Sequence, residues 1–166
     1  KLDYITALGY WLEDDFIRLI EIIEKNIMAK VHSDFSDFFE KWFDILVDNE
    51  LIKIKLYEDF TPLIQQDGHD IDYNYLSGGE KTAAALAYRL ALNQVINSMS
   101  NIKTKDLIIL DEPTDGFSAE QLDRIRLILD ELDMKQIIIV SHDAKIESFV
   151  DNIIRLNKKE HVTEIV

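Results

Sequence analysis

The first part of the chain carries apolar residues at helical spacing. Between Ile5 and Val31 they recur every three or four positions, and the residues between them are mostly charged. Glycine and proline are absent from Tyr10 to Thr61, so nothing there punctuates a helix. The pattern predicts a long helix, which is either the end of a coiled coil or an ordinary amphipathic helix packed on its own domain. The apolar positions are Ile5, Leu8, Leu12, Phe16, Leu19, Ile23 and Ile27.

A second amphipathic helix is predicted from Phe35 to Val47, because its apolar residues fall on one helical face. Most of them are aromatic, which is typical of a core. Alternation of apolar residues with lysines over 52–56 then predicts a strand with one solvated face. The stretch from Phe60 to Tyr75 predicts a hairpin, in which Asp67-Gly68 supplies the positive φ angles of the turn.

The pattern changes after Ser77, where helices and short apolar runs alternate. Such runs are typical of strands buried on both faces, and the alternation predicts an α/β fold whose parallel sheet has right-handed crossovers. The predicted elements are a helix from Ser77 to about Met99, strands Asp106–Leu110 and Gln136–Val140, helices Ser118–Leu132 and Ala144–Val150, and terminal strands 152–156 and 162–166 around a polar turn at 157–160.

Composition narrows the class of protein. The 166 residues are 47% hydrophobic, which suits one folded domain, and the absence of cysteine excludes disulfides and cysteine zinc sites. No apolar run reaches the roughly 20 residues of a membrane span. A net charge of −14 repels nucleic acid, so if the chain serves a nucleic-acid machine, most of the DNA contact should come from another chain or a local patch. The chain starts at Lys1, which is expected for a fragment or a processed piece.

The clearest chemical signal is a pair of carboxylates at a predicted strand end. Asp111 and Glu112 follow an apolar run, and Pro113 stops its continuation. Ligands of open α/β sheets bind beyond the carboxyl ends of the strands. There Asp111 can hold Mg²⁺, and Glu112 can polarise a water that attacks a γ-phosphate. The alternative is a buried strand that ends in an acidic turn.

His142 repeats this arrangement at the end of the next predicted strand. A histidine at that place can hydrogen-bond a γ-phosphate or the attacking water, although a lone histidine is more often structural. It gains weight because Asp111, Glu112 and His142 all fall at carboxyl ends of predicted parallel strands.

The stretch "LSGGE" from Leu76 to Glu80 has the build of an anion-binding helix start. Ser77 is a good N-cap, and Gly78-Gly79 allows close backbone approach to phosphate oxygens. The alternative is a plain capped helix with Glu80 in the capping-box position. None of the five glycines belongs to a phosphate loop of the form G-x-x-x-x-G-K-[ST], so nothing here cradles α- and β-phosphates.

Three motifs together resemble those of ABC-type ATPases. "LSGGE" resembles the signature motif, "LIILDEPTDGFS" (Leu107–Ser118) resembles Walker B with the D-loop, and "IIIVSHD" (Ile137–Asp143) resembles the switch-histidine segment. The absent Walker A loop makes the chain similar to the C-terminal lobe of an SMC-type head, whose two lobes are separated by a long coiled coil. "DEPT" resembles the DNA double-strand-break repair ATPases (the Rad-fifty family).

The resemblance implies an α/β lobe over residues 32–166, with a mainly parallel sheet flanked by helices, and a coiled-coil root helix over residues 1–31. Asp111 would complete a Mg²⁺ site, Glu112 would activate water and His142 would sense the γ-phosphate. Ser77 and Gly79 would contact ATP held by the opposite head. The implied nucleotide-binding set is Ser77, Gly78, Gly79, Glu80, Asp111, Asp115 and Ser118.

The resemblance also implies an assembly. ATP would bind an N-terminal Walker A lobe, and two heads would form a homodimer around two ATP molecules. The ATPase would work with a nuclease partner on DNA inside the cell, in the cytoplasm or nucleoid, or in the nucleus of a eukaryote, and without a membrane. The root helix would be a docking place for the nuclease.

One position departs from the family pattern, and other proteins remain candidates. Ser118 stands where the D-loop usually has aspartate, and it could bond across a dimer or cap a helix; Asp115 is a possible substitute. The alternatives are a chromosome-organising SMC head, a RecN/RecF-like repair ATPase, a transporter nucleotide-binding domain and a non-catalytic module. The missing upstream loop disfavours the transporter, and the intact Asp111-Glu112 pair disfavours the non-catalytic module.

Overall fold

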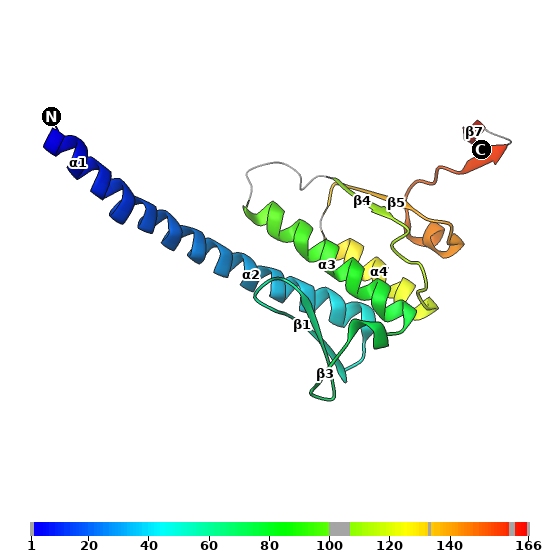
Figure 1. Ribbon diagram of the computed structural model, residues 1–166. Helices are drawn as coiled ribbons and strands as arrows, with labels where there is room; N and C mark the ends of the chain where they lie inside the picture. The colour runs from blue at the N-terminus through cyan, green and yellow to red at the C-terminus, as the bar shows by residue number, and fades with distance from the viewer. Residues whose placement is uncertain (1, 100–106, 133, 160–161, 166) are drawn as a thin grey trace.

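A single helical rod runs from Leu2 to Val47 and projects from the rest of the chain (Figure 1). The computed structural model describes residues 2–99, 107–132, 134–159 and 162–165. The rod comprises α1 (Leu2–Tyr10), a π-helical segment η1 (Trp11–Phe16) and α2 (Ile17–Val47). The prediction of two separate helices is therefore wrong at residues 32–34, since the absence of glycine and proline there lets one helix continue. It ends at Asp48, whose φ of 41° is left-handed.

The rod changes character near Val31. Before it, every described residue is exposed except the half-buried Gly9, and after it aromatic side chains enter the core. These pack against α3 (Gly78–Met99), whose buried face is rich in alanine, so that the two helices approach closely. Trp42 Nε1 donates a hydrogen bond of 2.8 Å to Gln94 Oε1, which satisfies its only polar group. The buried α2 residues are Phe35, Phe39, Trp42, Phe43 and Leu46.

An antiparallel sheet follows the rod and confirms the predicted strand and hairpin. Its strands are β1 (Ile52–Leu56), β2 (Pro62–Gln66) and β3 (His69–Ile71), in that spatial order. Ile54 of β1 lies opposite Ile64 of β2, and both are buried. Asp67 and Gly68 have φ of 50° and 79°, which gives the predicted turn.

The second half of the lobe is a parallel βαβ unit. Its elements are β4 (Leu107–Asp111), α4 (Ala119–Glu131) and β5 (Gln136–Val140), and β4 pairs with β5 in parallel. The prediction that both strands are buried on both faces is wrong for this chain. Ile108 and Leu110 face the core, whereas Ile109 is 61% and Val140 51% exposed, because no element of the described chain covers that face of the sheet.

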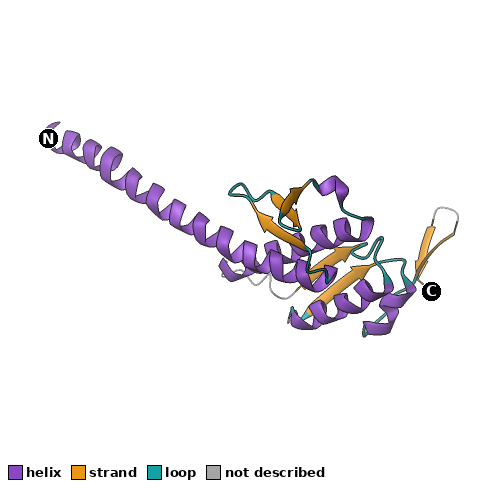
Figure 2. Cartoon of the chain, turned by 90° about the horizontal axis from the view of Figure 1, so that it is seen from below, coloured by secondary structure: helices purple, strands orange, loops and turns teal. Residues whose placement is uncertain are grey.

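The last elements are the 3-10 helix η4 (Ala144–Phe149) and a hairpin of β6 (Leu156–Lys159) and β7 (Val162–Ile165) that stands apart from the other elements (Figure 2). The predicted strand over 152–156 is wrong, since residues 152–155 form no regular structure. Asn157 belongs to β6 and not to a turn, because the antiparallel pairing extends to Lys159. The predicted strand positions Asp106 and Val166, and Glu160 of the predicted turn, lie outside the described residues.

We expect Ala87→Leu to lower the free energy of unfolding by about 1–3 kcal/mol, because a larger side chain overpacks the contact of α3 with α2. Ala87 is fully buried, whereas Ala85 on the same helix is exposed. The matched control Ala85→Leu should change the stability by less than about 0.5 kcal/mol. Urea unfolding of both variants measures the difference, and equal losses of stability in the two variants would contradict the packing of α3 on α2.

Candidate functional site

The two parallel strands bring Glu112 and His142 together. Asp111 is the last residue of β4 and lies opposite Val140, the last residue of β5, so the residues after both strands meet at one edge. The backbone N–H of Glu112 donates a hydrogen bond of 2.8 Å to the Val140 carbonyl. Beyond it, Glu112 Oε2 lies 3.0 Å from His142 Nδ1. The residues that sequence reasoning named as catalytic are therefore in direct contact.

Glu112 occupies a strained backbone conformation. Its φ is 43°, in the left-handed region that non-glycine residues rarely adopt and that costs about 1–2 kcal/mol. Such strain persists where the surroundings fix the residue, and it is frequent at functional sites. Here the bond to the Val140 carbonyl and the buried Pro113 that follows hold the turn.

The Glu112 carboxylate raises the pKa of His142 above its ordinary value. The hydrogen bond is the largest cause and the charge of Glu112 the second, while desolvation opposes them and Asp115 and Asp143 add smaller increases. A raised folded-state pKa means that this pair stabilises the fold fully below the unfolded pKa of about 6.5. The contribution is lost as the pH rises through the folded value.

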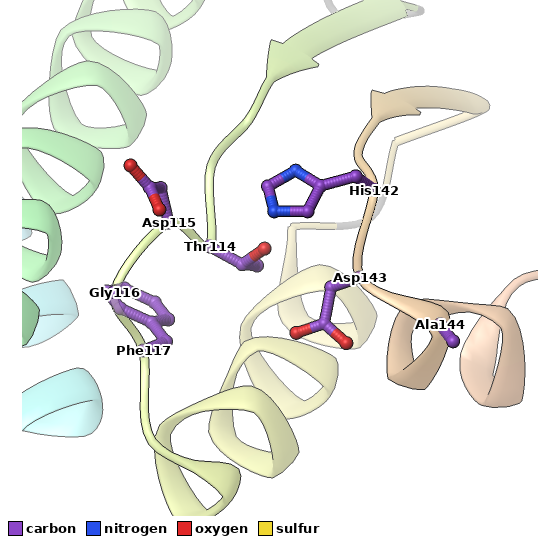
Figure 3. A pocket seen from close by; sticks show the side chains of 7 residues that line it. All are labelled: Thr114, Asp115, Gly116, Phe117, His142, Asp143 and Ala144. Atoms are coloured by element: carbon purple, nitrogen blue, oxygen red, sulfur yellow. The ribbon is translucent and has the colours of Figure 1, made fainter.

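A hollow of about 310 Å³ opens beside this pair (Figure 3). One side is the loop after β4, and the other is the start of η4 after β5. The imidazole of His142 and the carboxylates of Asp115 and Asp143 lie around the side chain of Thr114. The lining residues are Thr114, Asp115, Gly116, Phe117, His142, Asp143 and Ala144.

A second hollow, of about 290 Å³, lies where α3 and α4 begin. At α3, Ser77 Oγ accepts the N–H of Glu80 at 3.3 Å, and Glu80 Oε2 accepts the N–H of Ser77 at 2.8 Å. This reciprocal pair is a capping box, which was the alternative interpretation of this stretch, with Glu80 in the capping-box position. It leaves the Ser77 hydroxyl proton for another acceptor, since the oxygen only accepts in the box.

The start of α4 repeats the same device. Ser118 Oγ accepts the N–H of Gln121 at 3.2 Å, and Gln121 Oε1 accepts the N–H of Ser118 at 3.1 Å. Of the two roles left open for Ser118, the structure shows the helix cap. All four capping side chains line the second hollow, together with Val47, Asp48, Asn49, Glu120 and Arg124.

Comparison with known proteins gives relatives that cover most of this chain. No family model matches the chain. A DNA double-strand break repair Rad50 ATPase of Pyrococcus abyssi is 36% identical over 135 residues, which are 78% of this chain and 14% of the relative. The protein of the same description from Thermococcus kodakarensis is 30% identical over 151 residues, 87% of this chain and 16% of the relative. The chain thus spans less than a fifth of these relatives.

Solved structures agree on the fold. The Smc head domain with a coiled coil and joint from Pyrococcus yayanosii matches with a TM-score of 0.71 at 20% identity, over 92% of this chain and 30% of that one. A chain from work on ATP-driven dimerization of SMC ATPases matches with a TM-score of 0.66 at 21% identity, over 86% of this chain and 88% of that one. The chain is the C-terminal lobe of an SMC/ABC-type ATPase head. The predicted α/β fold class is confirmed.

Most candidate residues of this SMC-type lobe fall into two groups. Glu112, His142 and Asp115 gather at the strand ends, and Ser77, Glu80 and Ser118 gather at the helix starts. Asp111 is exposed at the end of β4. Sequence reasoning missed Gln121, although its place three residues after Ser118 is the capping-box spacing that identified Glu80.

The described residues supply only some of the ligands that a magnesium ion needs. Among the described residues, no group of three or more histidine, aspartate or glutamate side chains could hold a metal. Mg²⁺ in nucleotide sites is commonly bound by one or two carboxylates, substrate phosphates and waters. The exposed Asp111 carboxylate at a strand end suits that mode.

In the same described part of the lobe, no helix is long and apolar enough to cross a membrane.

We expect Glu112→Gln to lower the pKa of His142, because it removes the carboxylate charge and replaces the acceptor of the main hydrogen bond. Asp115→Asn should lower the pKa by a smaller amount, since Asp115 acts through its charge alone. An NMR titration of the His142 ring protons measures both shifts. An equal or larger effect of Asp115→Asn would contradict the role of the Glu112 contact.

Proposed function

We propose that this chain is the C-terminal lobe of an ATP-dependent DNA double-strand-break repair ATPase. The observation that carries the proposal is the hydrogen-bonded Glu112–His142 pair at the ends of two parallel strands, in a chain that lacks a phosphate loop. The identity of 36% to a repair ATPase supports repair over chromosome organisation, because the SMC head structures share only 19–21% identity with this chain.

In the proposed reaction, Glu112 is the general base. A water molecule attacks the γ-phosphate of ATP while Glu112 takes a proton from that water. The bond between the γ-phosphorus and the bridging oxygen of ADP breaks, which gives ADP and phosphate. The hydrogen bond of 3.0 Å to His142 would orient the carboxylate, and His142 would donate a hydrogen bond to a γ-phosphate oxygen with its other ring nitrogen. A magnesium ion held by Asp111 would neutralise phosphate charge.

The exposed sheet face supports an N-terminal Walker A lobe as a partner. Leu107, Ile109 and Val140 expose 43%, 61% and 51% of their surface on the uncovered side of β4 and β5. Apolar strand faces of this kind are normally covered in α/β proteins. The relatives are far longer than this chain, so most of such a protein lies outside it. That remainder would supply the loop that cradles the α- and β-phosphates.

The exposed part of the rod supports a coiled-coil root over residues 1–31. Its apolar residues recur at helical spacing, yet they are between 41% and 80% exposed. A stripe of that kind is stable when another helix covers it. The second strand of a coiled coil would cover part of the stripe, and a nuclease partner would dock on the remainder. Residues 32–166 then form the lobe proper.

The helix start at Ser77 supports engagement with a second head. Gly78 and Gly79 present backbone N–H groups at the positive end of the α3 dipole, and Ser77 adds a hydroxyl. These groups would meet the γ-phosphate of ATP bound to the opposite head, with Asp115 and Ser118 near the same interface. ATP would then stabilise only the engaged pair, and hydrolysis would release it. The assembled intracellular complex, and not this acidic lobe alone, would contact DNA.

We expect the lobe alone to lack ATPase activity and to gain it when the Walker A lobe of the same protein is added. In that assembly, Glu112→Gln should lower kcat at least about 100-fold, because the general base is lost, and it should trap an ATP-bound dimer. Phosphate release and size-exclusion chromatography measure the two effects. Appreciable ATPase activity of the lobe alone, or unchanged turnover of Glu112→Gln, would refute the proposal.

We expect Ser77→Arg to prevent ATP-driven engagement of two heads and to spare ATP binding by the Walker A lobe. The long cation would occupy the place of the second head's phosphate. Ser77→Asn is the matched control, because asparagine also caps a helix start and should preserve the beginning of α3. Cross-linking of heads and binding of a fluorescent ATP analogue separate the two effects. Equal loss of both would show that the Ser77 site is misassigned.

A further inference from the structure

The start of α3 touches the loop between β4 and α4 at Gly79. A Cβ atom added to Gly79 would lie 2.7 Å from Gln121 Oε1 and 3.2 Å from the Gly116 carbonyl oxygen. The same addition at Gly78 would meet nothing within 4 Å. A side chain at position 79 would therefore displace the Gln121 amide and press on a backbone oxygen, whereas position 78 has open space.

Gly116 shapes its side of this contact. Its φ of 76° is left-handed, and its own added Cβ would lie 3.8 Å from the Gly78 carbonyl carbon and 3.9 Å from the Gly79 nitrogen. That backbone turn suits glycine and carries the carbonyl that approaches Gly79. The loop after the Walker B strand and the first turn of the signature helix therefore meet backbone to backbone.

Gln121, in the first turn of α4, also takes part in this contact between α3 and the loop. Its side-chain oxygen accepts the N–H of Ser118 at 3.1 Å, and its own N–H donates to Ser118 Oγ at 3.2 Å. The capping box fixes that oxygen in place, and the same oxygen faces Gly79 at the position of a missing side chain. One amide thus holds the start of α4 and limits the position of the start of α3.

We propose that Gln121 is a positioning residue that couples the two nucleotide-facing segments of the lobe. The inference rests on the proposed function, in which Ser77 to Gly79 face the ATP of the second head and Asp111, Glu112 and His142 serve the ATP of their own. Because Gln121 and Gly116 join these segments, displacement at one ATP displaces the groups that meet the other. Gln121 touches no ATP and acts through Gly79 and Ser118.

A double substitution in the full-length ATPase tests the contact. Gly79→Ala should weaken ATP-driven head engagement at least about tenfold, since its Cβ meets the Gln121 amide and a backbone oxygen. Gln121→Ala in the same chain should restore most of the engagement, because the 2.7 Å contact disappears and the 3.2 Å one needs a small shift. If Gly79 serves only the second head's phosphate, the double variant stays as impaired as Gly79→Ala, and the inference falls.

Hydrogen exchange in the full-length protein without nucleotide gives a readout that does not depend on ATP. Gln121→Ala should raise exchange over residues 116–121 and also over 77–81, because both segments lose the shared amide. Gln121→Glu keeps the acceptor oxygen and should keep both segments protected. A change confined to residues 116–121 would reduce Gln121 to a helix cap and overturn the coupling.

Turnover kinetics separate positioning from stability. In Gln121→Ala, we expect the Hill coefficient for ATP to fall towards one while KM changes by less than about threefold, since two coupled sites become independent. An unchanged Hill coefficient refutes the coupling. If the wild-type protein shows no ATP-driven engagement at all, the proposed function fails, and the exchange experiment still decides whether Gln121 holds the two segments together.

Discussion

The packing of α2 on α3 is the contact on which the rest of the lobe depends. Aromatic side chains of α2 fill the space that the small alanines of α3 leave, and the ring of Tyr88 meets those of Phe35 and Phe39 edge to face, with centroids 4.8 and 5.5 Å apart. This contact fixes where α3 begins, and therefore where Ser77 and Gly79 lie. The C-terminal end of α2 lines the same hollow as Ser77 and Ser118, and an ion pair between Asp48 and Arg124 ties that end to α4. The C-terminal end of the rod and the starts of α3 and α4 are thus joined by direct contacts.

The parallel pairing of β4 with β5 places the chemistry. Parallel strands end on one side, so residues thirty positions apart in the sequence become hydrogen-bonded neighbours. The left-handed turn at Glu112 lies at that edge, and the Val140 carbonyl holds it. The strained backbone of Glu112 and the raised pKa of His142 occur at the same edge of the sheet, and perturbed groups of this kind cluster at functional sites.

The local features of this lobe could be predicted because they arise from neighbouring residues. The Asp67-Gly68 turn, the alternation in β1 and the capping residue Ser118 depend on side chains a few positions apart. Two errors have a tertiary cause. The rod continues through residues 32–34 because the same helix passes from solvent into the core. The apolar runs of β4 and β5 are typical of a sheet covered on both faces, but the described residues of this chain cover only one face. The contact of Gly79 with Gln121 joins segments forty-two positions apart, so no local sequence pattern predicts it. Glu112 and His142 are also far apart, at thirty positions, yet two matching strand ends predicted that they lie at one edge of the sheet.

The exposure of the site also has a physical meaning. The side chains of His142 and Glu112 are 78% and 41% exposed, so water screens their attraction in this lobe. Removal of that water strengthens every charge–dipole contact at the strand ends and at the helix starts. In the proposed assembly, the Walker A lobe and the second head would exclude it. The groups of this lobe would then bind phosphate strongly only when the partners are in place, which would link ATP hydrolysis to engagement of the two heads. An acidic surface with a net charge of −14 works in the same direction, because it disfavours premature capture of a triphosphate by the isolated lobe.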